Sequence, residues 1–240
     1  MADAKAHGLT GSFELFKKSK EVVMNNLSTF GVLLLIPLIT NLLTMFGSDA
    51  DKKPLGSANY GMNLSGATLG LGAGLVIVII VANFISSLML NGASLEATGG
   101  KKPTLSEVWP YVPKFAARTV GLAFAVGFMV LIGFLALIVP GLIMIRRYFL
   151  AQYVMIDQDL SIGEAMKESA RISKPHSGSV WGIIGVTIVL SIAGIIPVVG
   201  WIAAFVLTSL YAVAPAMRYR ELKKLEGAAG HHVAPVAATE

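Results

Sequence analysis

Two adjacent arginines, Arg146 and Arg147, are the residues of this chain best suited to bind a ligand. A guanidinium group is planar and offers paired N–H donors that match a phosphate or another oxyanion. The nearest acidic residue in sequence is Asp157, at the opposite end of the apolar stretch that contains the pair. A charge at membrane depth costs several kcal/mol unless it finds a partner, water or the interface. The pair is therefore a candidate for contact with a lipid phosphate or an anionic solute. The alternative is that both side chains only reach the headgroups and set the depth of the helix.

A second group of candidates consists of small and amide side chains inside apolar stretches. Asn41 and Asn83 can form hydrogen bonds across a helix interface. Gly66, Gly70 and Gly74 recur at four-residue spacing and let a neighbouring helix approach closely. These five residues are candidates for helix packing or for a polar lining.

Catalytic and metal-binding sets are incomplete in this sequence. No histidine lies in an apolar stretch where it could act as a base for a serine nucleophile. The pair His231 and His232 has no further ligand nearby, and Asp157 with Asp159 is too small a set for a cation. The chain has no cysteine. We therefore predict a protein that is not an enzyme, with no cofactor, no metal and no nucleic-acid motif.

The elements that carry these residues are membrane-spanning in character, because 55% of residues are hydrophobic, 14% are charged and the mean hydropathy is +0.71. About 20 apolar residues cross the hydrocarbon core of a bilayer. Six stretches approach that length: 27–46, 69–91, 119–139, 141–157, 179–196 and 198–217.

Basic residues predict the orientation, since Lys and Arg are enriched on the cytoplasmic side. Of the 19 Lys and Arg residues, 15 lie in segments on one side of the six stretches. This asymmetry predicts that both termini are cytoplasmic. It divides the chain into an N-terminal amphipathic segment (1–26) that is not a cleavable signal peptide, a six-helix transmembrane domain (27–217) and a disordered tail (218–240).

A threefold repeat organises the chain: a helix start and an amphipathic stretch precede each of three membrane hairpins. The starts are Gly11 to Glu14, Thr104 to Glu107 and Ser161 to Glu164, of which the last two have the spacing of a capping box. In the third copy one face consists of apolar or small side chains: Ile162, Ala165, Met166, Ser169 and Ile172. We expect such a helix to lie flat on the inner membrane surface. The first copy has a similar stripe that includes Phe13, Phe16 and Val23.

The last two hairpins are predicted to turn at Pro140 with Gly141 and at Pro197 with Gly200. Neither tip carries a charge, so a full crossing and a re-entrant hairpin both remain open, and length favours a crossing. If the fourth span begins at Gly141 on the outer side, the arginine pair lies about 8 Å below that end.

Residues 139–174 resemble a known family through Pro140-Gly141, the arginine pair, Asp157, Ser161-x-x-Glu164-Ala165 and Ser173-Lys174. This pattern is similar to the membrane domain associated with bacterial glycerophosphoryl diester phosphodiesterases and to its stand-alone relatives. The resemblance covers roughly residues 100–217. It implies a prokaryotic plasma membrane and a six-helix bundle. The soluble phosphodiesterase domain of some relatives has no counterpart here, so hydrolase activity is not implied.

The sequence thus predicts an all-α, multi-pass protein with six transmembrane helices in three hairpins, each preceded by an amphipathic interfacial segment. We expect a non-enzymatic role in which it engages membrane lipids, especially anionic phospholipid, or a membrane-protein partner or second copy. The alternatives are a small transporter or channel for an anionic solute and an accessory subunit of a larger membrane assembly.

Overall fold

The computed structural model describes residues 9–46, 73–192 and 199–230, and in these ranges all regular secondary structure is α-helical. The predicted all-α class is therefore confirmed for the described chain. The helices are α2 (Ser12–Asn25), α3 (Leu27–Phe46), α5 (Ala73–Thr98), α6 (Leu105–Val108), α7 (Tyr111–Ala136), α8 (Ile138–Tyr148), α9 (Ala151–Gln158), α10 (Ile162–Ser173), α11 (Ser177–Ile192), α12 (Val199–Leu210) and α13 (Ala214–Gly230).

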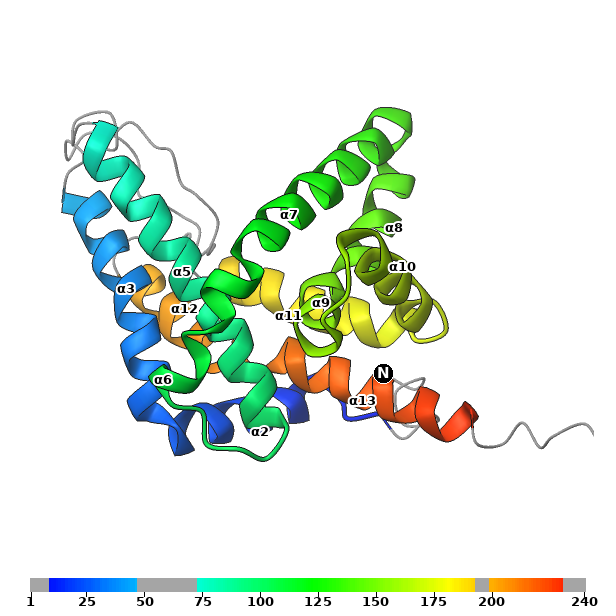
Figure 1. The fold of residues 1–240 in the computed structure, drawn as a ribbon, viewed down its shortest axis with the longest axis horizontal. Helices are drawn as coiled ribbons and strands as arrows, with labels where there is room; N and C mark the ends of the chain where they lie inside the picture. The colour runs from blue at the N-terminus through cyan, green and yellow to red at the C-terminus, as the bar shows by residue number, and fades with distance from the viewer. Residues whose placement is uncertain (1–8, 47–72, 193–198, 231–240) are drawn as a thin grey trace, which may run out of the picture.

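Two helical hairpins diverge from a common base (Figure 1). One arm consists of α3 and α5, and the other consists of α7 and α8. The end of the molecule from which the two arms diverge is called the base. It is formed by α2, α13 and residues 99–107. Helix α3 contacts α5, α7 contacts α8, and α11 contacts α12.

Three helical segments are long and apolar enough to cross a membrane: Ile77–Thr98, Tyr111–Ala136 and Ile202–Gly227. Two bent pairs raise the number to five if each pair forms one span, namely α2 with α3 and α10 with α11. The described chain thus contains three to five candidate spans, in place of the six that the sequence predicts.

The predicted fourth span, 141–157, is wrong as a continuous helix. The chain breaks between α8 and α9 at Phe149 and Leu150, and α9 is only 8 residues long. Five residues of α9 are buried: Ala151, Tyr153, Val154, Met155 and Ile156. Because α9 contacts α5, α7, α10 and α13, its apolar side chains form the centre of the protein core.

The amphipathic helix α10 has the face that the sequence predicts. Ala165, Met166, Ser169 and Ile172 are buried, while the opposite face is charged. Its capping box is present, with Ser161 and Glu164 as the reciprocal pair, and the equivalent box joins Thr104 to Glu107 at α6. The buried face packs on α8 and α9, so its apolar character is explained by protein contacts.

In α2 the predicted stripe is only partly correct. Phe13 is 68% exposed, whereas Leu15, Ser19 and Val23 are buried. The axis of α2 bends by 100° into α3, and that of α10 bends by 104° into α11. Both amphipathic helices therefore lie nearly perpendicular to the apolar helices that follow them.

Hydroxyl groups satisfy backbone carbonyls where helices are interrupted. Pro37 lies inside α3 and has no N–H to bond to the carbonyl of Leu33. The Ser86 hydroxyl of α5 donates to that carbonyl and fixes the first hairpin. Likewise, the Ser19 hydroxyl of α2 donates to the Leu210 carbonyl at the end of α12, at 2.7 Å. Buried backbone carbonyls without a partner would be costly.

The predicted turn at Pro140 and Gly141 is displaced. The bend occurs at Leu137, which has extended dihedral angles (φ −171°, ψ 159°), and Pro140 lies in the first turn of α8, where its missing N–H is tolerated. Gly141 is buried inside α8 and contacts Gly133 of α7. The close helix contact of this hairpin thus depends on glycines in α7 and α8.

The other predicted turn and packing residues have different outcomes. Pro197, Gly66 and Gly70 lie outside the described residues, Gly74 is the second residue of α5, and Gly200 is buried at the start of α12. The predicted disordered tail is helical as far as Gly230. Tyr219 and Leu222 are fully buried in this part of α13, and their apolar side chains join the core.

Candidate functional site

Arg146 and Arg147, the arginine pair, lie in the last turn of α8. Both side chains are half-buried. Their position follows from the length of α8, which begins directly after the bend at Leu137 and ends at Tyr148. The carbonyls of this last turn carry partial negative charge, which favours cations at this end of a helix.

The arginine pair differs from the other arginines of the chain in its partners. All six arginines lie in the described ranges, and four of them have a carboxylate within 4.0 Å: Arg118, Arg171, Arg218 and Arg220. Neither Arg146 nor Arg147 has a carboxylate partner among the described residues. In addition, the buried Nε of Arg146 has no hydrogen-bond acceptor in this part of the chain. The pair can therefore accept an oxyanion without first breaking an ion pair.

A hydrogen bond fixes the level of the arginine pair relative to α10. The Ser169 hydroxyl on the buried face of α10 donates to the Arg147 carbonyl at 2.7 Å. In the continuous fourth span predicted from the sequence, residues 148–157 would form a straight helix between the Arg147 carbonyl and the amphipathic segment. The carbonyl would then lie far from that segment. Because the span breaks after Tyr148, the arginine pair instead lies beside the amphipathic helix.

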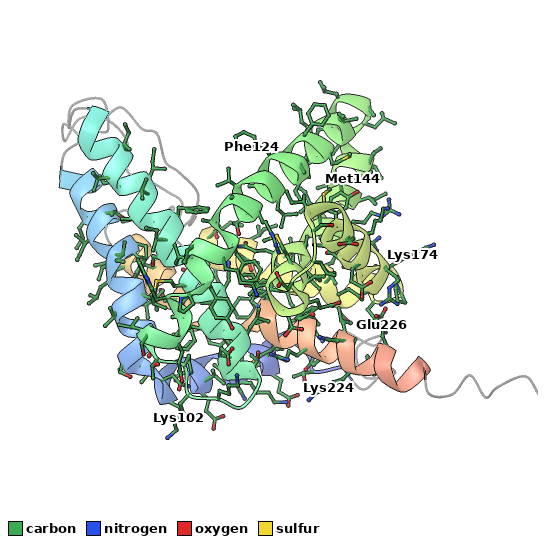
Figure 2. The ribbon with its side chains drawn as sticks, in the orientation of Figure 1. Lys102, Phe124, Met144, Lys174, Lys224 and Glu226 are labelled. Atoms are coloured by element: carbon green, nitrogen blue, oxygen red, sulfur yellow. The ribbon has the colours of Figure 1, made fainter. Side chains whose placement is uncertain are left out.

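The segment of the chain that precedes the arginine pair is wholly apolar. Residues 120–145 of α7 and α8, which we call the apolar hairpin, contain no side chain with a nitrogen or oxygen atom. Many of its large side chains are exposed, with Phe124 at 76% and Leu135 at 77%. Figure 2 shows Phe124 and Met144 on this arm and Lys102 and Lys224 at the base. A surface of this kind requires a cover of lipid or protein.

Asn41 and Asn83 have structural hydrogen bonds. The Asn83 amide donates to the Thr40 hydroxyl at 3.0 Å, which joins α5 to α3, and to the Ile79 carbonyl at 2.9 Å. The Asn41 amide donates to the Pro37 carbonyl of its own helix at 2.7 Å. Both residues lie in the first hairpin, away from the arginine pair in sequence and in fold.

A polar cluster at the base was not predicted from the sequence. It lines a cavity of about 350 Å³ bounded by Leu95, Glu96, Gly99, Lys101, Tyr111, Ile156, Asp157 and Arg220. The Tyr111 hydroxyl donates to Glu96 at 2.6 Å, and Lys101 pairs with the same carboxylate at 2.8 Å. Arg220 lies 3.4 Å from Asp157 and donates to the Leu95 carbonyl at 2.9 Å.

The cluster connects α5, α7, α9 and α13 through matched charges. Its ionic groups already have partners within the protein. The cluster therefore serves to hold the four helices together and is a weaker candidate for a ligand site than the arginine pair. No pattern in the sequence predicted this cluster, because Glu96 lies in the linker after the apolar stretch 69–91 and Asp157 is the last residue of the stretch 141–157. Their meeting depends on tertiary packing and could not be read from spacing.

Asp159 anchors the start of α7 to the end of α9. It accepts from Arg118 at 2.6 Å and pairs with Lys114 at 3.0 Å. The hydrogen bonds from Lys114 and Arg118 hold the pKa of the Asp159 carboxyl below its usual value. Its backbone is left-handed (φ 52°), which ends α9 and directs the chain into α10.

Comparison of the chain with protein-family models, with curated protein sequences and with solved structures finds no match in any of the three. The functional argument therefore depends on the geometry of this chain alone.

Proposed function

We propose that this chain is a non-enzymatic, multi-pass protein of a prokaryotic plasma membrane that engages phospholipid, with Arg146 and Arg147 contacting lipid phosphate. The relationship to the membrane domain of glycerophosphoryl diester phosphodiesterases is part of the same proposal. So are both termini in the cytoplasm and a role in membrane organisation.

One observation carries the proposal: the arginine pair has no carboxylate partner among the described residues, although the other four arginines do. A half-buried guanidinium without a counter-charge is costly at the edge of an apolar region. A phosphate oxygen would supply both the negative charge and the missing acceptor for the Arg146 Nε. The neighbouring apolar hairpin would contact the acyl chains of the same lipid.

The base supports a preference for anionic lipid. Lys102 and Lys224 are exposed there (Figure 2), as are Lys17 and Lys20 of α2. Basic residues at a membrane surface each contribute about 1 kcal/mol of attraction to anionic lipid. A membrane-protein partner or a second copy could cover part of the exposed apolar hairpin in place of lipid.

Transport of an anionic solute would require the arginine pair to line a cavity. The polar cavity at the base is lined by other residues and has two carboxylates on its wall. Lipid contact therefore explains the geometry of the arginine pair better than transport does.

Native mass spectrometry of the protein released from mild detergent tests the proposal. We expect phospholipid adducts on the wild type and their loss in the Arg146→Gln, Arg147→Gln double variant. The control is Lys102→Gln, Lys224→Gln, which removes the same charge from the base. It should weaken only the diffuse attraction to anionic lipid and retain the adducts held by the arginine pair. Equal lipid retention in the two double variants would contradict a specific phosphate contact.

A further inference from the structure

The position of the apolar hairpin in the bilayer follows from its contact with α10, if the chain is membrane-embedded as proposed above. The exposed face of α10 carries Glu164, Lys167 and Arg171. Such a face belongs in water or among headgroups. Since α10 is bent by 104° from the apolar helix α11, it lies along the membrane boundary when α11 enters the bilayer.

The bond between Ser169 and the Arg147 carbonyl then places the end of α8 directly beneath α10. The radius of an α-helix with its side chains is about 5 Å. From Arg147 to the bend at Leu137 is a further run of about 15 Å at the helical rise of about 1.5 Å per residue. The tip therefore lies at most about 20 Å from the boundary, whereas the hydrocarbon core is about 30 Å thick.

If the hairpin crossed the bilayer completely, α10 would have to lie deeper in the membrane. If Leu137 reached the far boundary, Arg147 would lie about 15 Å inside the core. The charged face of α10 would then be drawn into hydrocarbon, where each charge costs several kcal/mol. The apolar part of α7, residues 120–136, is about 25 Å long. It fits this depth with a tilt of about 40°, which is at the upper end of the range for membrane helices.

Two backbone hydrogen bonds close the chain at the tip of the hairpin and reduce the number of polar groups that it exposes. The Leu137 N–H donates to the Gly133 carbonyl at 3.0 Å, and the Gly141 N–H donates to the Leu137 carbonyl at 3.3 Å. Pro140, in the first turn of α8, has no N–H that would need a partner. Backbone polar groups at membrane depth must be satisfied within the protein.

We infer that the hairpin of α7 and α8 is re-entrant: it enters from the side on which α10 lies, turns near the bilayer centre at Leu137, and returns to the same side. Acyl chains of that leaflet cover the apolar hairpin. The arginine pair therefore contacts phosphates of the leaflet that α10 contacts, which is the inner leaflet in the proposed orientation.

Single-cysteine labelling tests the depth directly, because the natural chain has no cysteine. Leu137→Cys is labelled with a fluorescent bimane and reconstituted in phosphatidylcholine and phosphatidylglycerol vesicles that contain lipids with a spin label at a shallow or a deep acyl position. Lys174→Cys serves as the exposed control beside α10, and Phe124→Cys as the control within α7.

We expect the label at Leu137 to be quenched most strongly by the deep spin label and to be inaccessible to iodide in the external medium. Strongest quenching by the shallow spin label, together with iodide access from the side opposite Lys174, would show a full crossing and overturn the inference while leaving membrane embedding intact. Iodide quenching without lipid quenching at both Leu137 and Phe124 would overturn the inference and the proposed membrane function together.

Discussion

Gly133→Ala gives the sharpest test of how the apolar hairpin packs. A Cβ atom at this position would lie 2.8 Å from the Gly141 Cα and 3.0 Å from its nitrogen. Both are backbone atoms of α8, so the two helices must separate. Overpacking of this kind costs about 1–3 kcal/mol. The gain in helix propensity from Gly to Ala offsets about 1 kcal/mol of that cost.

Gly127→Ala is the matched control, because Gly127 lies two turns earlier in α7 and a Cβ there meets nothing within 4 Å. It receives the same gain in propensity without the clash, so the two variants should differ by about 1–3 kcal/mol. For a chain of this size the difference corresponds to a gap in Tm of about 2–12 °C. Thermal unfolding in detergent, followed by tryptophan fluorescence, measures it. If Gly133→Ala is as stable as Gly127→Ala, the close contact between α7 and α8 is refuted.

Two further variants test the contacts that position the arginine pair and the base. Ser169→Ala leaves the part-buried Arg147 carbonyl without its donor and should cost about 1–3 kcal/mol of unfolding free energy. Ser173→Ala on the same helix is the control, because it removes a buried hydroxyl that has no partner in the described chain. Equal Tm values for the two variants would contradict the role given to Ser169. Asp159→Asn should lower the Tm at pH 6, and because the native pKa of Asp159 is lowered, the stability it contributes is present above about pH 4 and is lost as the pH falls through the native pKa. The difference in Tm between wild type and Asp159→Asn should thus shrink as the pH is lowered from about 4, and an unchanged difference would show that the carboxylate charge is not involved. Asn tolerates the left-handed backbone, so the fold is retained.

Local patterns predicted local structure well. The capping boxes at Thr104 and Ser161 lie where the sequence placed them, since each depends on residues three apart. The apolar face of α10 was also correct, because helical periodicity fixes which side chains share a face. The sequence did not predict what covers this apolar face, because the choice between lipid and protein depends on where α8 and α9 lie.

Predictions of where helices begin and end were less accurate. Pro140 was expected to stop α7, yet a proline is equally suited to the first turn of the next helix, and the bend at Leu137 has no turn residue to mark it. The break at Leu150 likewise has no proline or glycine. The tail after Arg218 has a polar composition, but its apolar residues Tyr219 and Leu222 find a core formed by distant helices.

The candidate site shows the same division. The arginine pair was evident from the sequence because two charges interrupt an apolar stretch. That it has no carboxylate partner in the described part of the chain, and that it contacts α10, could be learned only from the fold. The cluster around Glu96 and Asp157 combines residues from four helices and has no sequence signature.

The most direct test of the central claim is the number of phospholipids retained by the Arg146→Gln, Arg147→Gln protein in native mass spectrometry, relative to wild type and to Lys102→Gln, Lys224→Gln. The account predicts that only the arginine variant loses bound phospholipid while its fold is preserved. Retention of the same lipids by all three proteins would contradict the assignment of Arg146 and Arg147 as a phosphate site.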